Sequence, residues 1–192
     1  MPFIRAFRSS SRQSLLAVAL MLVAAIPVRA QLSYTIGANA GLVVPTGDLS
    51  QIASSGYTIA ATLGMHAPLT PIGLRVEGSF TDLPYKNNVS GGGNHRIYGF
   101  ALDAAYNLGT ASANGGLYLT GGLGYFGWRA ADVPTIFGTS SSETTWDLGL
   151  NAGLGYYLPL SGFTMYFEGR YRKIFSSDFN QGMFPITVGI TF

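Results

Sequence analysis

The sequence contains no cysteine and only two histidines among its 192 residues. Without cysteine the chain has no disulfide bond, no thiolate nucleophile and no cysteine-ligated zinc site. Charged side chains make up only 10% of the residues, whereas soluble domains average about 25%. After residue 30, no run reaches the about 18 apolar residues that a membrane-spanning helix needs. These absences exclude a bundle of transmembrane helices and argue against an ordinary soluble domain.

Glycine, with 26 residues, and aromatic residues, at 13%, are abundant. Eight segments alternate apolar side chains with small or polar ones: 34–44, 57–66, 72–80, 96–107, 117–128, 145–156, 163–173 and 183–192. Such alternation over about ten residues is typical of a transmembrane β-strand. In a membrane, pairing the last strand with the first removes both unpaired sheet edges. The pattern predicts an all-β fold, an eight-stranded antiparallel up-and-down transmembrane β-barrel.

The first 30 residues have the features of an export signal. Three arginines in the first twelve residues precede a 12-residue apolar run, 15–26, and small residues at 28 and 30 precede a cleavage site before Gln31. The run is shorter than the about 20 residues of a spanning helix. We therefore expect a cleavable secretory signal peptide at 1–30 and an outer-membrane β-barrel domain at 31–192. An uncleaved N-terminal anchor is the alternative.

Cleavage changes the charge of the chain. The precursor has 11 Lys and Arg and 9 Asp and Glu, a net charge of +2. Four arginines lie in residues 1–30, which leaves seven basic against nine acidic residues and a net charge of −2. The basic character of the precursor therefore gives no reason to expect nucleic-acid binding.

Short connections alternate with longer ones. The longer ones, at 45–56, 83–95, 129–143 and 176–182, are rich in Gly, Ser, Asn or Pro. In outer-membrane barrels the short turns face the periplasm and the long loops face outward. We therefore expect both termini in the periplasm and four outer loops.

Seven charged residues fall within the predicted strands, all on the face opposite the apolar residues. This lumen charge cluster is Arg75, Glu77, Asp103, Asp147, Glu168, Arg170 and Arg172. A one-residue slip would turn these charges to lipid, where Arg or Lys at the midplane costs about 2–4 kcal/mol. We expect Arg75 to pair with Asp103 or Glu77.

For Arg170, we expect pairing with Asp147 or Glu168. The interior of an eight-stranded barrel is just wide enough for side chains to fill it. Three cations and four anions therefore predict a paired polar core rather than an open channel.

The exported start, the eight alternating segments and the segment 44–48 (VPTGD) at the start of the first long loop resemble the small outer-membrane β-barrel domain family, the OmpA/OmpX-like eight-stranded barrels. The resemblance covers essentially all of residues 31–192. It implies outer-membrane lipids as surroundings and insertion by the barrel-assembly machinery. In this family that machinery recognises a terminal strand ending in Phe, here Gly189, Ile190, Thr191 and Phe192.

The leading interpretation of function is a non-enzymatic barrel that contributes to envelope integrity or surface interaction through its outer loops, with an extracellular ligand binding there. Because one fold hosts many functions, two alternatives stay open. The first is a small pore or transport channel, with Arg75, Glu77, Arg170 and Arg172 as its gate.

The second alternative is an outer-membrane hydrolase of lipids or peptides. It would need His95 beside Asp82 or Glu143, together with a serine such as Ser90. We expect no cofactor, and no metal site either, because His66 and His95 fall at opposite ends of the predicted barrel.

The sequence Gly122-Leu-Gly124-Tyr-Phe-Gly127 matches G-x-G-x-x-G. A nucleotide site would need a strand before this motif and a helix after it, whereas here it lies inside a predicted strand. We expect its glycines to make room for bulky lumen residues such as Arg170 and Tyr166.

Overall fold

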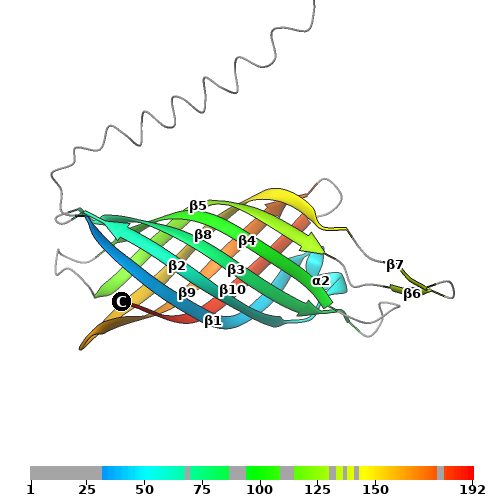
Figure 1. Cartoon of the computed structure of the whole chain (residues 1–192), viewed down its shortest axis with the longest axis horizontal. Helices are drawn as coiled ribbons and strands as arrows, with labels where there is room; N and C mark the ends of the chain where they lie inside the picture. Colours follow the sequence, from blue (N-terminus) through cyan, green and yellow to red (C-terminus); the bar gives the residue numbers. More distant parts are fainter. Residues whose placement is uncertain are drawn as a thin grey trace, which may run out of the picture. The chain divides into compact units, whose positions relative to one another are not determined.

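A computed structural model of the chain describes residues 32–67, 70–86, 94–108, 115–129, 133–135, 138–140, 143–176 and 180–192. The predicted signal peptide and Ser90 lie outside these residues. Eight strands form a closed barrel in which each strand is antiparallel to both of its neighbours (Figure 1). The predicted fold is confirmed.

The barrel strands are β1 (Ser33–Gly47), β2 (Gly56–His66), β3 (Ile72–Pro84), β4 (Asn94–Asn107), β5 (Gly116–Arg129), β8 (Thr145–Leu160), β9 (Phe163–Phe175) and β10 (Asn180–Thr191). Between them lie the helix α2 (Leu49–Ile52) and a hairpin of β6 (Val133–Thr135) and β7 (Gly138–Ser140). A strand needs about 9–11 residues to cross a bilayer. The 11 to 16 residues of the barrel strands are therefore sufficient.

Strands β1 and β10 close the barrel. Their register runs from Gly37 opposite Thr191 to Gly47 opposite Gln181. Beyond it, Ile36 N donates to Phe192 O at 3.1 Å and Phe192 N donates to Ile36 O at 2.9 Å. The carboxy-terminal phenylalanine thus lies beside the first strand, as predicted, and no barrel strand keeps a free edge.

The outer wall of the barrel is apolar. Leu42, Phe100 and Leu148 are each more than 60% exposed, whereas a water-soluble protein buries most side chains of this kind in its core. We call the end of the barrel with Ser33 and Phe192 the terminal end, and the end with α2 the loop end (Figure 1). Outward aromatic residues lie near both ends: Tyr34, Tyr106, Tyr156 and Phe192 at the terminal end, and Tyr57, Tyr98, Trp146 and Tyr171 toward the loop end.

The segment after β1, predicted as a plain loop, forms α2. Ser50 Oγ donates to Gly47 O at 2.6 Å, and Lys86 N donates to Ile52 O at 2.9 Å, which holds α2 to the chain after β3. Leu49 is fully buried. Alternation of polar and apolar residues does not predict this helix, because α2 is a single turn. Among the described residues, no helix is long and apolar enough to cross a membrane.

Candidate functional site

Six of the seven charged residues predicted for the lumen meet inside the barrel. They are Arg75, Glu77, Asp103, Glu168, Arg170 and Arg172, and none is more than 7% exposed. We call these six residues the charge layer. Strand alternation explains the placement, because each of the six shares its strand face with other buried residues while the residues between them face outward.

Arg170 on β9 lies at the centre of the charge layer. Its Nη2 is 2.5 Å from Glu77 Oε2, and its Nη1 is 3.0 Å from Asp103 Oδ2. Its Nε is 2.7 Å from Glu168 Oε1. Because Glu77 is on β3 and Asp103 on β4, which are not neighbours of β9 in the barrel, the guanidinium spans the lumen.

The other two arginines complete the layer. Arg75 lies 2.9 Å from Glu168 and 3.5 Å from Asp103. Arg172 lies 2.9 Å from Glu77, and its Nε donates to Asn151 Oδ1 at 2.9 Å.

The charge layer has three cations and three anions, so its formal charges cancel. Bringing a charge out of water costs several kcal/mol, and good geometry to an opposite charge offsets that cost. The arrangement thus gives a buried but neutral interior. Two of its six pairs were predicted from the sequence, Arg75 with Asp103 and Arg170 with Glu168. The other four were not: Arg75–Glu168, Arg170–Glu77, Arg170–Asp103 and Arg172–Glu77.

Asp147 is the predicted lumen charge that the charge layer does not include. Its Oδ2 accepts a hydrogen bond from Trp128 Nε1 at 2.9 Å, nearer the loop end. Of the two partners predicted for Arg170, the structure places Glu168 beside it and gives Asp147 an indole partner instead. Asp147 faces inward like the others but lies too close to the end of β8 to reach Arg170.

Glycines opposite the bulky lumen residues make room for them. A methyl group at Gly153 would lie 2.5 Å from Arg170 Cγ, and Gly189 lies against the Tyr166 ring. The prediction that the G-x-G-x-x-G glycines serve Arg170 and Tyr166 was therefore wrong. Those three glycines make room instead for Asp103, Phe126 and Trp146.

Toward the loop end, a second group of buried side chains fills the lumen. This apolar layer is Val43, Leu49, Ala53, Leu83, Ile97, Ala101, Phe126, Ile174 and Met183. Leu49 of α2 belongs to it, so the helix covers the lumen at this end. The Phe126 ring lies against Gly99 and Gly149, and the Arg172 guanidinium lies 4.7 Å from the ring centre, which joins the two layers.

The alternation of the sequence did not predict the apolar layer. Val43 lies between outward Leu42 and Val44, and Ala101 lies between outward Phe100 and Leu102. Both faces of these strands are apolar there, so the contrast that marks a lumen face disappears. Phe126 within its glycine-rich neighbourhood was the available signal, because a large ring facing glycines on adjacent strands indicates a filled interior.

Toward the terminal end, tyrosines extend the charge layer. Tyr118 donates to Glu168 Oε2 at 2.7 Å and stacks on Tyr157 with ring centres 4.1 Å apart. Tyr166 accepts a hydrogen bond from Asn39 Nδ2 at 3.0 Å. Each of these hydroxyls is hydrogen-bonded or near a polar group, which favours a rigid, filled interior over a path for solutes.

His95 lies at the loop end, in a setting unlike that of a catalytic base. It is 1% exposed, its Nε2 is 3.3 Å from Gln181 Oε1, and its ring stacks on Trp128 at 5.7 Å. The acid predicted to hold it, Asp82, instead accepts hydrogen bonds from Asn94 and Arg96. The other predicted acid, Glu143, is exposed.

His66 ends β2 at the terminal end, so the two histidines lie at opposite ends as predicted. In the described part of the chain, no three His, Cys, Asp or Glu side chains gather as a metal site requires. Gly189, Ile190 and Thr191 end β10, and the ring of Phe192, the next residue, lies 6.1 Å from that of Phe163. Their recognition by the assembly machinery stays a prediction.

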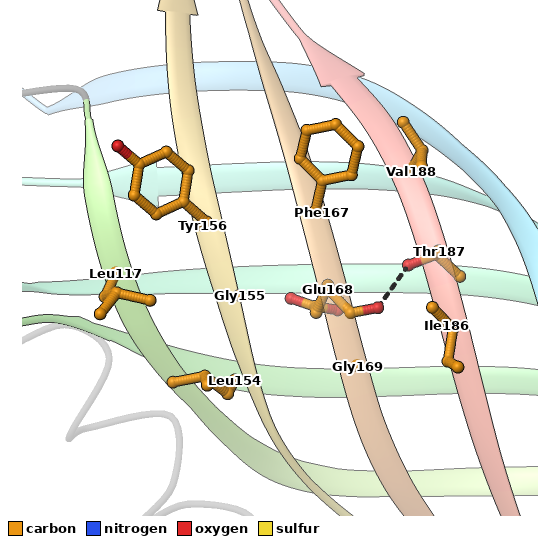
Figure 2. A pocket seen from close by; sticks show the side chains of 10 residues that line it. All are labelled: Leu117, Leu154, Gly155, Tyr156, Phe167, Glu168, Gly169, Ile186, Thr187 and Val188. Carbon is orange, nitrogen blue, oxygen red and sulfur yellow. Dashed lines mark hydrogen bonds between the residues drawn. The ribbon is translucent and has the colours of Figure 1, made fainter.

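The outer wall has a hollow of about 300 Å³, and Figure 2 shows the residues that line it. Phe167, Tyr156 and Val188 border it, and Gly169 leaves its floor without a side chain. The carboxylate of Glu168 is fully buried in the charge layer, and most of the side chains that line the hollow are apolar. The hollow therefore suits contact with lipid chains, and its lining gives no reason to propose a catalytic site there.

Residues 14–192 match the family model described as outer membrane protein beta-barrel domain. A major outer membrane protein of Thermus thermophilus has a similar fold, with a TM-score of 0.58 at 13% identity over 84% of this chain and 98% of that one. Neisserial surface protein A has a similar fold with a TM-score of 0.55 at 17% identity, over 83% of this chain and 97% of that one. The outer membrane protein Ail of Yersinia pestis has a TM-score of 0.52 at 17% identity, over 83% of this chain and 100% of that one. None of the curated proteins matches the sequence.

Proposed function

Because this chain belongs to the outer membrane protein β-barrel domain family, we propose that it is a non-enzymatic outer-membrane barrel with a closed lumen. It contributes to envelope integrity or surface interaction through its outer loops. The terminal end faces the periplasm. The loop end, which carries α2 and the β6–β7 hairpin, faces outward.

The observation that carries this proposal is the double closure of the lumen. Arg170 reaches across from β9 to Glu77 and Asp103, and the apolar layer under α2 follows directly above Arg172. An ion would have to separate buried ion pairs and then pass the closely packed apolar layer. Both steps cost several kcal/mol.

A small pore gated by Arg75, Glu77, Arg170 and Arg172 is the second candidate. Charged residues inside a barrel favour it, because such side chains set ion selectivity in channels. However, opening that gate would leave the apolar layer in place. The closed barrel needs no second movement and is therefore the better-supported proposal.

The hydrolase is the weakest candidate. Catalysis by histidine needs an acid that orients the ring and a nucleophile within hydrogen-bond reach. The described partner of His95 is the neutral amide of Gln181. Surface interaction has support of another kind, because the Yersinia pestis neighbour is named attachment invasion locus protein.

The test is single-channel recording of refolded residues 31–192 in a planar bilayer, after a heat-modifiable gel shift has verified folding. We expect no steady conductance from the wild type. The variant Arg170→Ala should unfold more readily and still carry no current, because the apolar layer is intact. Reproducible current steps from the wild type would overturn the closed barrel and favour the pore.

A further inference from the structure

His95 and Gln181 meet across the lumen at the loop end. His95 is on β4 and Gln181 on β10, which are not neighbours in the barrel. Neither side chain is more than 1% exposed, and His95 Nε2 lies 3.3 Å from Gln181 Oε1. Because an amide oxygen only accepts hydrogen bonds, the neutral His95 ring carries its proton on Nε2 and leaves Nδ1 as an acceptor. In the described part of the chain, no group bonds to Nδ1.

Two aromatic rings pack against His95. Trp128 of β5 stacks on it with the ring centres 5.7 Å apart. Tyr85, which follows β3, meets it edge to face with the ring centres 6.2 Å apart. With Gln181 included, His95 therefore joins three parts of the loop end that are far apart in the sequence.

The segment around Tyr85 holds α2 in place. Tyr85 forms an isolated β-bridge with Ala53, the residue after α2. Ser54 N donates to the carbonyl of the residue before Tyr85 at 2.8 Å. Lys86 N donates to the last carbonyl of α2 at 2.9 Å. A displacement of Tyr85 from His95 would therefore loosen α2, which covers the lumen.

No ion pair of the described residues includes His95. The charged side chains described at this end of the barrel are Asp48, Asp82, Lys86, Arg96, Arg129, Glu143, Asp147 and Lys173. Of the carboxylates, Asp82 is bound to Arg96 and Asp147 accepts from Trp128. The groups that touch the His95 ring are an amide, an indole and a phenol, and each of them is neutral.

Protonation of His95 would therefore bury a charge and place an N–H on Nδ1 without an acceptor, and both changes cost free energy. The next residue, Arg96, faces outward with its side chain 54% exposed, so this level of β4 lies beyond the lipid, where an outward arginine is costly. Burial lowers the pKa of His95 below its usual value, although the hydrogen bond with Gln181 raises it.

We propose that His95 is a pH-sensitive switch for the loop end: the neutral ring keeps α2 closed over the lumen through Tyr85 and Gln181, and protonation releases α2. A released His95 has the ordinary pKa of about 6.5. The released state therefore binds more protons than the closed state, and closure weakens as the pH falls from about 6.5 through the lower pKa of the closed state. The charge layer contains no histidine, so the switch acts on the loop end alone.

Hydrogen exchange followed by NMR tests the switch, with residues 31–192 refolded in nanodiscs. The Ser54 and Lys86 amides report on α2, because both form the hydrogen bonds that hold it. We expect their protection factors to fall roughly sixfold between about pH 7 and about pH 5.5, where a released histidine takes up its proton. The Phe192 amide, which donates to Ile36 O at the terminal end, should keep its protection.

Three variants separate the parts of the switch. His95→Gln retains a hydrogen-bonding side chain that does not titrate, so its protection factors should not change with pH. His66→Gln, the same change at the terminal end, should retain the fall. Gln181→Glu places a carboxylate beside His95 and favours the protonated ring, so protection should rise as the pH falls. Each variant is first verified by its gel shift.

Equal protection of the wild-type Ser54 and Lys86 amides at both pH values would overturn the proposal. A fall that persists in His95→Gln would overturn it as well, because another group would then be the one that titrates.

Discussion

The charge layer and the apolar layer fill adjoining parts of one lumen by different physical means. In the charge layer, each guanidinium has carboxylate oxygens at 2.5 to 3.5 Å, so its stability depends on which atoms meet. In the apolar layer, burial and shape hold the side chains, as where Phe126 lies against Gly99 and Gly149. The first should therefore respond sharply to loss of one charge, and the second should tolerate exchanges that conserve volume.

The largest effect should come from Glu77→Gln. The amide keeps the size of the side chain but removes the negative charge that faces Arg170 and Arg172. Breaking a buried ion pair in this way costs about 3–5 kcal/mol. Denaturant unfolding in lipid vesicles measures the free energy of unfolding of this variant and of the wild type.

Its control is Glu143→Gln, an identical change at an exposed position, which should alter the free energy of unfolding by about 0.5 kcal/mol or less. If the two variants were equally stable, the ion pairs of the charge layer would contribute nothing to stability.

In the apolar layer, Leu49→Ala should cost about 2 kcal/mol, because it removes a buried side chain of α2 but leaves a site at the barrel end that is able to collapse. Leu49→Met conserves the volume and should cost less than about 1.5 kcal/mol. The same unfolding measurement compares them. Equal losses for methionine and alanine would show that the shape of Leu49, rather than its buried volume, matters.

Adding volume beneath the charge layer tests the glycines that make room for it. A methyl group in Gly153→Ala would lie 2.5 Å from Arg170 Cγ and from Gly169 O. Arg170 is unable to withdraw without lengthening its ion pairs, so we expect a loss of about 1–2 kcal/mol. The matched control is Gly169→Ala, whose methyl would meet Phe184 at an ordinary 3.4 Å on the outer wall. A control as unstable as Gly153→Ala would mean that glycine matters for the strand and not for Arg170.

The same contrast explains how much of the fold the sequence could predict. Strand number, closure and the inward face of Arg75 or Glu168 follow from an alternation that lipid enforces, because a charge on the outer face is costly. The ends of β3 and β8 extend four residues beyond the predicted limits. The alternation is lost at these ends, because Leu83 belongs to the apolar layer inside the barrel and Leu158, Pro159 and Leu160 follow one another on β8.

The candidate site was predictable only where charge marks it. Which carboxylate meets Arg170 depends on partners across the lumen, and Glu77 on β3 reaches it although β3 and β9 are not adjacent in the barrel. The spacing of residues along the sequence does not show which side chains meet across the lumen. The apolar layer has no charge to identify it, and Leu49 looks like any loop residue until α2 folds over the lumen.

Asp147 gives the smallest predicted effect and tests the boundary of the charge layer. In Asp147→Asn the amide oxygen still accepts from Trp128 Nε1, now 2.9 Å away, so the loss should stay within about 1 kcal/mol. The identical change at Asp103, which faces Arg75 and Arg170, removes a buried counter-charge and should cost about 3 kcal/mol or more. Denaturant unfolding of the two variants in the same vesicles compares their free energies of unfolding. If they lost equal stability, Asp147 would belong to the charge layer energetically, and its separation from Arg170 would not limit their interaction.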